Sequence, residues 1–306
     1  MVPVREKMAR MSPDDPRAAS TGGAQPPSPG TTAVLAGSGD LGTRVGLQLA
    51  RDGFHVLGLR RNPARLPAEL AGQAVDLRHQ RPQLPADTSV VVVALTADAH
   101  TAEAYRETYV TGLDHVLAAT GELAAPPRIV LVSSTAVHGV ADGSWVDETT
   151  PAVPATATAA ELRTAEERLH ARRPDATALR LTGLYGSARN RLVDSVRDGT
   201  ATISSTPVHT NRIHRDDASA AIVHLATRVA HPEPVYLGVD QESAERGAVL
   251  RFIADQLGVD HPPVVAPDSD RGHGKRCRGD KLRASGFVPT YPTYREGYGA
   301  ILRQNR

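Results

Sequence analysis

Residues 32–50, TAVLAGSGDLGTRVGLQLA, decide the fold. The apolar run Ala33–Ala36 is typical of a buried strand, and helical spacing of apolar residues resumes after the glycines. Between them lies the pattern G-x-G-x-x-G, which lets the backbone approach a pyrophosphate at a helix N-terminus. The alternative is a glycine turn without a ligand. The flanking strand and helix favour a dinucleotide site, formed by Gly37, Ser38, Gly39, Asp40, Leu41 and Gly42.

The end of the next predicted strand, Phe54–Leu59, indicates which dinucleotide is bound. NAD sites usually carry an Asp or Glu about 20 residues after the first glycine, where it binds the ribose hydroxyls. Arg60 and Arg61 stand there instead. Guanidinium groups form bidentate hydrogen bonds with phosphate, so this pair suits the 2′-phosphate of NADP. We predict NADP as the cofactor and NAD as the second choice; the alternative is that both arginines are solvated surface residues.

The composition limits the class of protein. Of the 306 residues 40% are hydrophobic, and 35 Lys and Arg against 34 Asp and Glu give a net charge of +1. Without a basic excess, a nucleic-acid partner is not expected. No apolar run reaches the ~20 residues that span a bilayer, and the single cysteine, Cys277, fits a reducing compartment. We expect a cytoplasmic protein with no membrane partner, and no residue spacing indicates a metal site.

The order of the predicted elements indicates an α/β fold. Apolar runs at 90–95 and 128–132 are typical of strands buried on both faces of a parallel sheet, and a long helix is predicted between them over Thr101–Ala119. We predict a Rossmann-type doubly wound parallel sheet with a smaller C-terminal α/β substrate lobe. The expected divisions are a disordered tail rich in Pro, Ser and Gly over 1–30, a nucleotide-binding domain over 31–182, and a mainly substrate-binding lobe over 183–306 with segments that return to the sheet.

Five motifs in order resemble those of the extended short-chain dehydrogenase/reductases, and more narrowly an atypical group of their NAD(P)-dependent epimerase/dehydratase branch. They are the glycine loop, VSSTAVHG at 132–139, VDETTP at 146–151, LRLTGLYG at 179–186 and NRIHRDD at 211–217. The resemblance implies a small-molecule substrate and a homodimer. It also implies cofactor contacts at two further strand ends: near the adenine Asp76 and Leu77, and near the nicotinamide ribose Ala94, Leu95 and Thr96.

The residues that transfer the proton in this family do not match. Its members use a Tyr and a Lys four residues apart, together with a Ser or Thr, because a nearby ammonium lowers the pKa of the phenol. Ser134 matches the Ser or Thr, but Thr158 stands at the Tyr position and Leu162 at the Lys position. A Thr hydroxyl is a far weaker acid than a phenol. Ser134 and Thr158 are therefore candidate catalytic residues, at positions that correspond to the family's catalytic positions. The family's usual acid/base pair of Tyr and Lys is absent from this sequence.

Other residues are candidates to replace the missing pair or to contact the substrate. His138 titrates near neutrality and could exchange the proton, or it could face away from the site. Tyr105 and Tyr109, on the predicted long helix, could project toward the nicotinamide or belong to the core. Arg212 could hold an anionic substrate or form a structural ion pair. The candidate substrate contacts are Thr135, Tyr185 and Arg212.

Three functions follow from these observations. The first is an NADP-dependent oxidoreductase that acts on a small polar metabolite with atypical acid/base residues. The second is a catalytically inactive NAD(P)-binding sensor or scaffold, which the missing Tyr and Lys favour. The third is an NDP-sugar epimerase or dehydratase; such enzymes normally need the same Tyr and bind NAD, so Thr158 and Arg60 count against it. The remaining motifs favour the first.

Overall fold

The computed structural model describes residues 26–186, 190–267 and 272–304. Its centre is a seven-stranded sheet in which all neighbouring strands are parallel. From edge to edge the strands are β12 (Val235–Gly238), β7 (Thr177–Leu181), β5 (Arg128–Ser134), β4 (Thr88–Val93), β1 (Thr32–Ala36), β2 (His55–Arg60) and β3 (Ala71–Ala74). The strand order reverses at β1, as in doubly wound sheets. The predicted fold class is confirmed.

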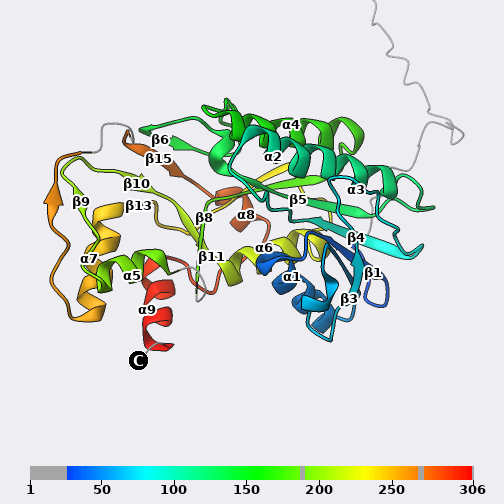
Figure 1. Ribbon diagram of the computed structural model, residues 1–306, viewed down its shortest axis with the longest axis horizontal. Helices are drawn as coiled ribbons and strands as arrows, with labels where there is room; N and C mark the ends of the chain where they lie inside the picture. The colour runs from blue at the N-terminus through cyan, green and yellow to red at the C-terminus, as the bar shows by residue number, and fades with distance from the viewer. Residues whose placement is uncertain (1–25, 187–189, 268–271, 305–306) are drawn as a thin grey trace, which may run out of the picture.

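Two layers of helices cover the sheet. Successive residues of a strand point to opposite faces, and because these strands are apolar at successive positions, both faces pack against helices. On one face Ala33 and Leu35 pack with helices α1 (Asp40–Arg51) and α6 (Arg215–Thr227). On the other face Val34 and Ala36 pack with the second layer. That layer contains α4 (Ala157–Arg172) and one long helix, which consists of α2 (Ala102–Tyr105), a π-helical segment (Arg106–Thr111) and α3 (Gly112–Thr120). Figure 1 shows α2, α3 and α4 together on one side of the sheet and α1 on the other.

The smaller lobe has a sheet and a core of its own (Figure 1, left). Its four strands are β13 (Ala244–Glu245), β10 (His209–Thr210), β15 (Gly274–Cys277) and β6 (Asp142–Val146), and a further pair is β9 (Ile203–Ser204) with β14 (Val264–Val265). The lobe's apolar core includes residues of α5 (Arg191–Arg197), α7 (Arg246–Leu257) and α9 (Tyr294–Gln304). Short elements elsewhere are η1 (Pro63–Arg65), η3 (Thr135–Val137) and α8 (Asp280–Ala284).

The chain crosses between the two sheets more than once. β6 comes from the first half of the chain but pairs with β15 in the smaller sheet, whereas β12 and α6 return to the large one. The chain is also divided at Asn211: β10 pairs within the smaller sheet, and β11 (Arg212–His214) pairs with β8 (Gly183–Tyr185). The predicted division at residue 182 stays a prediction.

Two further expectations concern the N-terminal tail and the absence of a membrane-spanning segment. Residues 1–25 of the predicted tail lie outside the described residues, and the backbone N–H of Gly30 donates a hydrogen bond to the carbonyl of Gly53. Within the described part of the chain, no helix has the length and apolar character needed to cross a bilayer.

Candidate cofactor and substrate site

The structure shows why each of the three positions in the glycine loop is occupied by glycine. Gly37 has φ +95°, a left-handed conformation, and a side chain there would collide with the carbonyl of Ala94. A side chain at Gly42 would collide with the carbonyl of Gly37. Gly39 differs, because no protein atom lies within 4 Å of the place where its Cβ would stand. Packing therefore explains two of the glycines, and the third borders open space at the start of α1, where a dinucleotide pyrophosphate fits.

A first cavity of about 330 Å³ lies beyond the loop, along the ends of β2 and β3. It brings together most of the predicted cofactor residues: Gly37, Ser38, Gly39, Arg60, Arg61, Asp76, Leu77, Ala94, Leu95 and Thr96. Its lining also includes five polar residues that the sequence analysis missed, Asn62, Arg65, Arg78, Asp98 and Thr108. Arg78 could have been predicted as a cavity residue, because it directly follows Asp76 and Leu77 in the sequence. Nothing in the sequence indicates that it pairs with Asp98.

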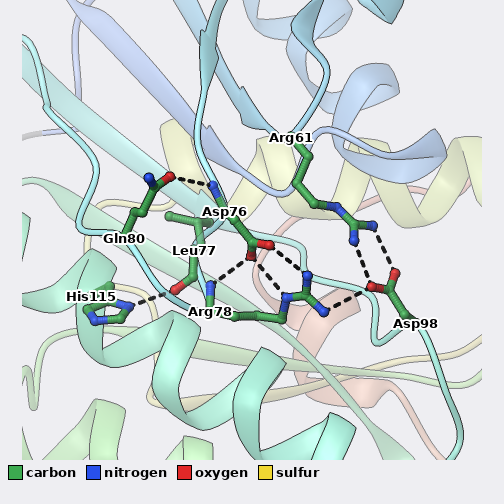
Figure 2. Close-up of polar contacts among 7 residues, drawn as sticks. All are labelled: Arg61, Asp76, Leu77, Arg78, Gln80, Asp98 and His115. Carbon is green, nitrogen blue, oxygen red and sulfur yellow. Dashed lines mark hydrogen bonds and ion pairs between the residues drawn. The ribbon is translucent and has the colours of Figure 1, made fainter.

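Asp98 joins two arginines of this cavity (Figure 2). It accepts two hydrogen bonds from Arg61, of 2.7 and 2.9 Å, and one of 3.1 Å from Nη1 of Arg78. Arg78 also binds Asp76 through Nε and Nη2, at 3.0 and 2.6 Å, and these hydrogen bonds lower the pKa of Asp76 to about 2. Both carboxylates are thus ionised at neutral pH and paired with guanidinium groups.

Arg60 faces the glycine loop. Its Nη1 donates a 2.9 Å hydrogen bond to the carbonyl of Ser38, so this side chain supports the loop as well as lining the cavity. Any substitution of Arg60 therefore disturbs the loop, and Arg61 and Arg78 are the cleaner probes of charge in this cavity.

A second cavity, of about 510 Å³, adjoins the first. Gly39, Ala94, Leu95 and Thr96 line both, and the second continues along Asp40, Leu41 and Gly42. Its far wall contains Ser134, Thr158 and Leu162. The structure therefore places two of the three predicted catalytic residues at one cavity, next to the loop.

The polar groups of that wall are weak acids. The hydroxyl of Ser134 accepts a 3.1 Å hydrogen bond from the backbone N–H of Ala136, and that of Thr158 lies 3.2 Å from the hydroxyl of Thr156. Leu162 is buried and contributes no charge. Neither hydroxyl has a cationic neighbour here that would favour its ionised form.

His138 does not line either cavity, which agrees with the alternative that it faces away from the site. It is 1% exposed, and its Nε2 lies 3.1 Å from Nη1 of Arg180. Because a guanidinium only donates, Nε2 is the acceptor. Burial, and then the charge of Arg180, lower the pKa of His138 to about 4, so the imidazole is neutral at pH 7. Arg180 in turn pairs with the buried Glu166, at 2.7 Å.

The three predicted substrate contacts do not line either cavity, and their role stays a prediction. The hydroxyl of Thr135 is directed to the carbonyl of Leu181. Tyr185 is buried against Tyr298, with ring centroids 4.6 Å apart, and Arg212 is buried over the ring of Tyr294. Tyr185, Tyr294 and Tyr298 belong to the core of the smaller lobe.

Three aromatic residues complete the second cavity. Its lining includes His100, Tyr105 and Tyr109, from the connection after β4 and from the long helix. The two tyrosine rings lie 5.1 Å apart, and the hydroxyl of Tyr105 is 3.1 Å from Nδ1 of His100. Two positions were considered for these tyrosines, core or cavity. Tyr105 lies at the cavity, and Tyr109 lines the cavity and also packs against the core. His100 was missed, because nothing in its sequence context distinguishes it from a loop residue.

Solved structures show which family shares this arrangement. A protein of Methylobacillus flagellatus, assigned to the NAD-dependent epimerases/dehydratases, is 31% identical, with a TM-score of 0.73 over 90% of this chain and 99% of its own. The chain belongs to the NAD-dependent epimerase/dehydratase family. A functionally unknown conserved protein of Silicibacter pomeroyi, 25% identical, has a TM-score of 0.72 over 90% of this chain and 99% of its own.

Other members of the epimerase/dehydratase family have been solved with ligands. The Thermus thermophilus UDP-glucose 4-epimerase, solved as its complex with NAD, is 20% identical, with a TM-score of 0.71 over 89% of this chain and 97% of its own, and shares the fold. No protein-family model and no curated protein matches the sequence. The assignment of the chain to its family therefore rests on the comparison with solved structures.

Proposed function

We propose that this epimerase/dehydratase family member is an NADP(H)-dependent oxidoreductase of a small polar metabolite. The observation that carries the proposal is the charge of the first cavity, which contains Arg60, Arg61, Arg65 and Arg78 and only two carboxylates, Asp76 and Asp98. A ribose 2′-phosphate carries nearly two negative charges at neutral pH, and forked guanidinium groups bind it bidentately. The usual carboxylate for NAD is replaced at Arg60.

The residues of the loop fit such a cofactor. The open space at Gly39 and the N–H groups at the start of α1 would hold the pyrophosphate, and Arg61 and Arg78 would hold the 2′-phosphate. The bound cofactor would supply hydride chemistry. The adjoining second cavity, with Ser134, would hold the substrate; Ser134 can donate a hydrogen bond to a substrate oxygen.

A second candidate is cofactor binding without catalysis. Thr158 and Leu162 favour it, because they remove the family's acid and its cation from the cavity wall. An NDP-sugar epimerase, the third candidate, has the support of the shared fold alone. We propose the oxidoreductase over both, since the cavity retains Ser134 and gains two phenols.

The test is a titration with NADPH and NADH, followed by nicotinamide fluorescence, on the wild-type chain and on Arg61→Ala and Arg78→Ala. Each variant should weaken NADPH binding about tenfold, the value of one lost charge-assisted contact, and leave NADH nearly unchanged. Arg172→Ala is the matched control, because it removes an arginine of α4 that pairs with Asp114 of α3 and lines neither cavity. Equal losses for both cofactors would refute the 2′-phosphate assignment, and no binding of either would refute the function.

A further inference from the structure

The second cavity lacks the family's acid and offers two phenols in its place. Among the described residues that line it, the side chains able to exchange a proton near neutral pH are Asp40, His100, Tyr105 and Tyr109. Asp40 is engaged, because Arg215 donates to it at 2.9 Å and Arg44 lies 3.7 Å away. The candidates for the acid/base residue are therefore His100, Tyr105 and Tyr109.

Tyr105 is the phenol with a proton partner. Its hydroxyl lies 3.1 Å from Nδ1 of His100, and the two rings meet edge to face at 5.4 Å. The imidazole is exposed, so it can exchange protons with solvent, whereas the phenol is only partly exposed and lines the cavity. Imidazole is the side chain best suited to pass a proton near neutrality.

Tyr109 is held differently. It is more deeply buried and packs against the core, and burial raises its pKa. The backbone around these two tyrosines is also unusual, since the π-helical segment Arg106–Thr111 begins directly after Tyr105 and contains Tyr109. Segments of this kind are rare and often occur at functional sites, because they change which side chains a helix presents.

We propose that Tyr105 is the acid/base residue of this site and that His100 connects it to solvent. The proposal rests on the oxidoreductase function proposed above. In the family pattern the phenol comes from α4, where Thr158 now stands; here it comes from the end of α2, which packs beside α4. His100 takes the place of the missing Lys as the group that stabilises the deprotonated phenol.

The proton balance in the reducing direction is as follows. A carbonyl substrate gains a hydride at carbon, which the bound cofactor supplies, and a proton at oxygen. The O–H bond of Tyr105 breaks and its proton passes to the substrate oxygen. The phenolate then takes the proton of His100 Nδ1, and His100 is protonated again from solvent. Oxidation of an alcohol uses the same groups in reverse.

The pair can be tested without cofactor. In a chain with isotope-labelled tyrosine ring carbons, the NMR resonance that Tyr105→Phe removes identifies Tyr105. Its chemical shift should vary with pH near neutrality and lose this dependence in His100→Ala, whereas the resonance that Tyr109→Phe removes should be unaffected by His100→Ala. A Tyr105 resonance with the same pH dependence in His100→Ala as in the wild type would overturn the pair.

The catalytic role is tested with NADPH and nitrobenzaldehyde as a probe carbonyl. Tyr105→Phe should lower kcat by about 10²-fold or more while NADPH affinity is kept. The matched control is Tyr291→Phe, at a tyrosine that lines neither cavity, and it should stay within a few-fold of the wild type. His100→Ala should remove a limb of the pH profile of kcat/KM. Wild-type kcat in Tyr105→Phe, a greater loss in Tyr109→Phe, or NADPH binding without reduction of the probe would overturn the proposal. Failure to bind NADPH would instead refute the proposed function.

Discussion

Asp98 occupies the place where a phosphate would be expected between two arginines. Its carboxylate accepts from both nitrogen donors of the Arg61 fork and from Arg78, an arrangement that a phosphate could also make. A 2′-phosphate that binds these arginines therefore meets a like charge and has to compete with it. Asp98 is, in this view, the residue that limits the affinity for NADP.

Asp98→Asn should strengthen NADPH binding about fivefold. The expected gain is small because the pair is half exposed, and exposed ion pairs are worth roughly 1 kcal/mol or less. NADH, which has no 2′-phosphate, should bind as before. Fluorescence titration measures both, with Asp52→Asn, a surface acid near Arg228, as the control. Weaker NADPH binding in Asp98→Asn would mean that Asp98 orients the arginines rather than competing for them.

At the level of elements, a buried polar cluster joins α4 to the sheet beneath the second cavity. Glu166 of α4 accepts a 2.6 Å hydrogen bond from Ser133 of β5 and pairs with Arg180 of β7; it is fully buried and Arg180 nearly so. Ser133 is the direct neighbour of Ser134. The position of Ser134 in the cavity wall thus depends on an ion pair that solvent does not reach.

Glu166→Ala should destabilise the chain by about 3–5 kcal/mol, because it leaves the buried guanidinium of Arg180 without its carboxylate. Glu166→Gln should cost less, since the amide oxygen can still accept from Ser133. Urea unfolding measures the difference. The neighbouring Glu167 is exposed, so Glu167→Ala should change the free energy of unfolding by about 0.5 kcal/mol or less. Similar values for Glu166→Ala and Glu167→Ala would contradict this account.

For the whole molecule, the sequence predicts features that depend on neighbouring residues and does not predict contacts between distant segments. Local periodicity predicted the strands β1, β2, β4 and β5 of the large sheet and the long helix between β4 and β5, because each follows its own pattern of apolar residues. The glycine loop was predicted for the same reason. The pairing of β6 with β15, the burial of His138 against Arg180, and the junction of Asp98 with Arg61 and Arg78 were not, because each joins segments far apart in the chain.

Stability of the whole chain should depend on pH through His138. Its pKa in the folded chain, about 4, lies below the 6.5 of an unperturbed histidine, so the unfolded state binds more protons between these values. The stabilising effect of the neutral imidazole is complete above pH 6.5 and is lost as the pH falls toward 4, by up to about 1.4 kcal/mol per pH unit.

Other buried groups titrate over the same interval, among them His214 in the same direction and Asp240 in the opposite one, so the comparison needs a variant. His138→Gln keeps an acceptor for Arg180 but does not titrate. Thermal unfolding of both chains at a series of pH values should show the advantage of the wild type shrinking on acidification below pH 6.5. A constant difference would show that His138 is protonated alike in both states.

The connection between β4 and α2 has a consequence for engineering. It carries Asp98, which binds the arginines of the first cavity, and His100, which binds the hydroxyl of Tyr105 in the second. Two properties that enzymes commonly encode in separate segments, the preference for a coenzyme and the route of the proton, would here be inherited together. A substitution in this connection made to change one trait should therefore be measured for the other as well, coenzyme affinity through Asp98 and proton exchange through His100.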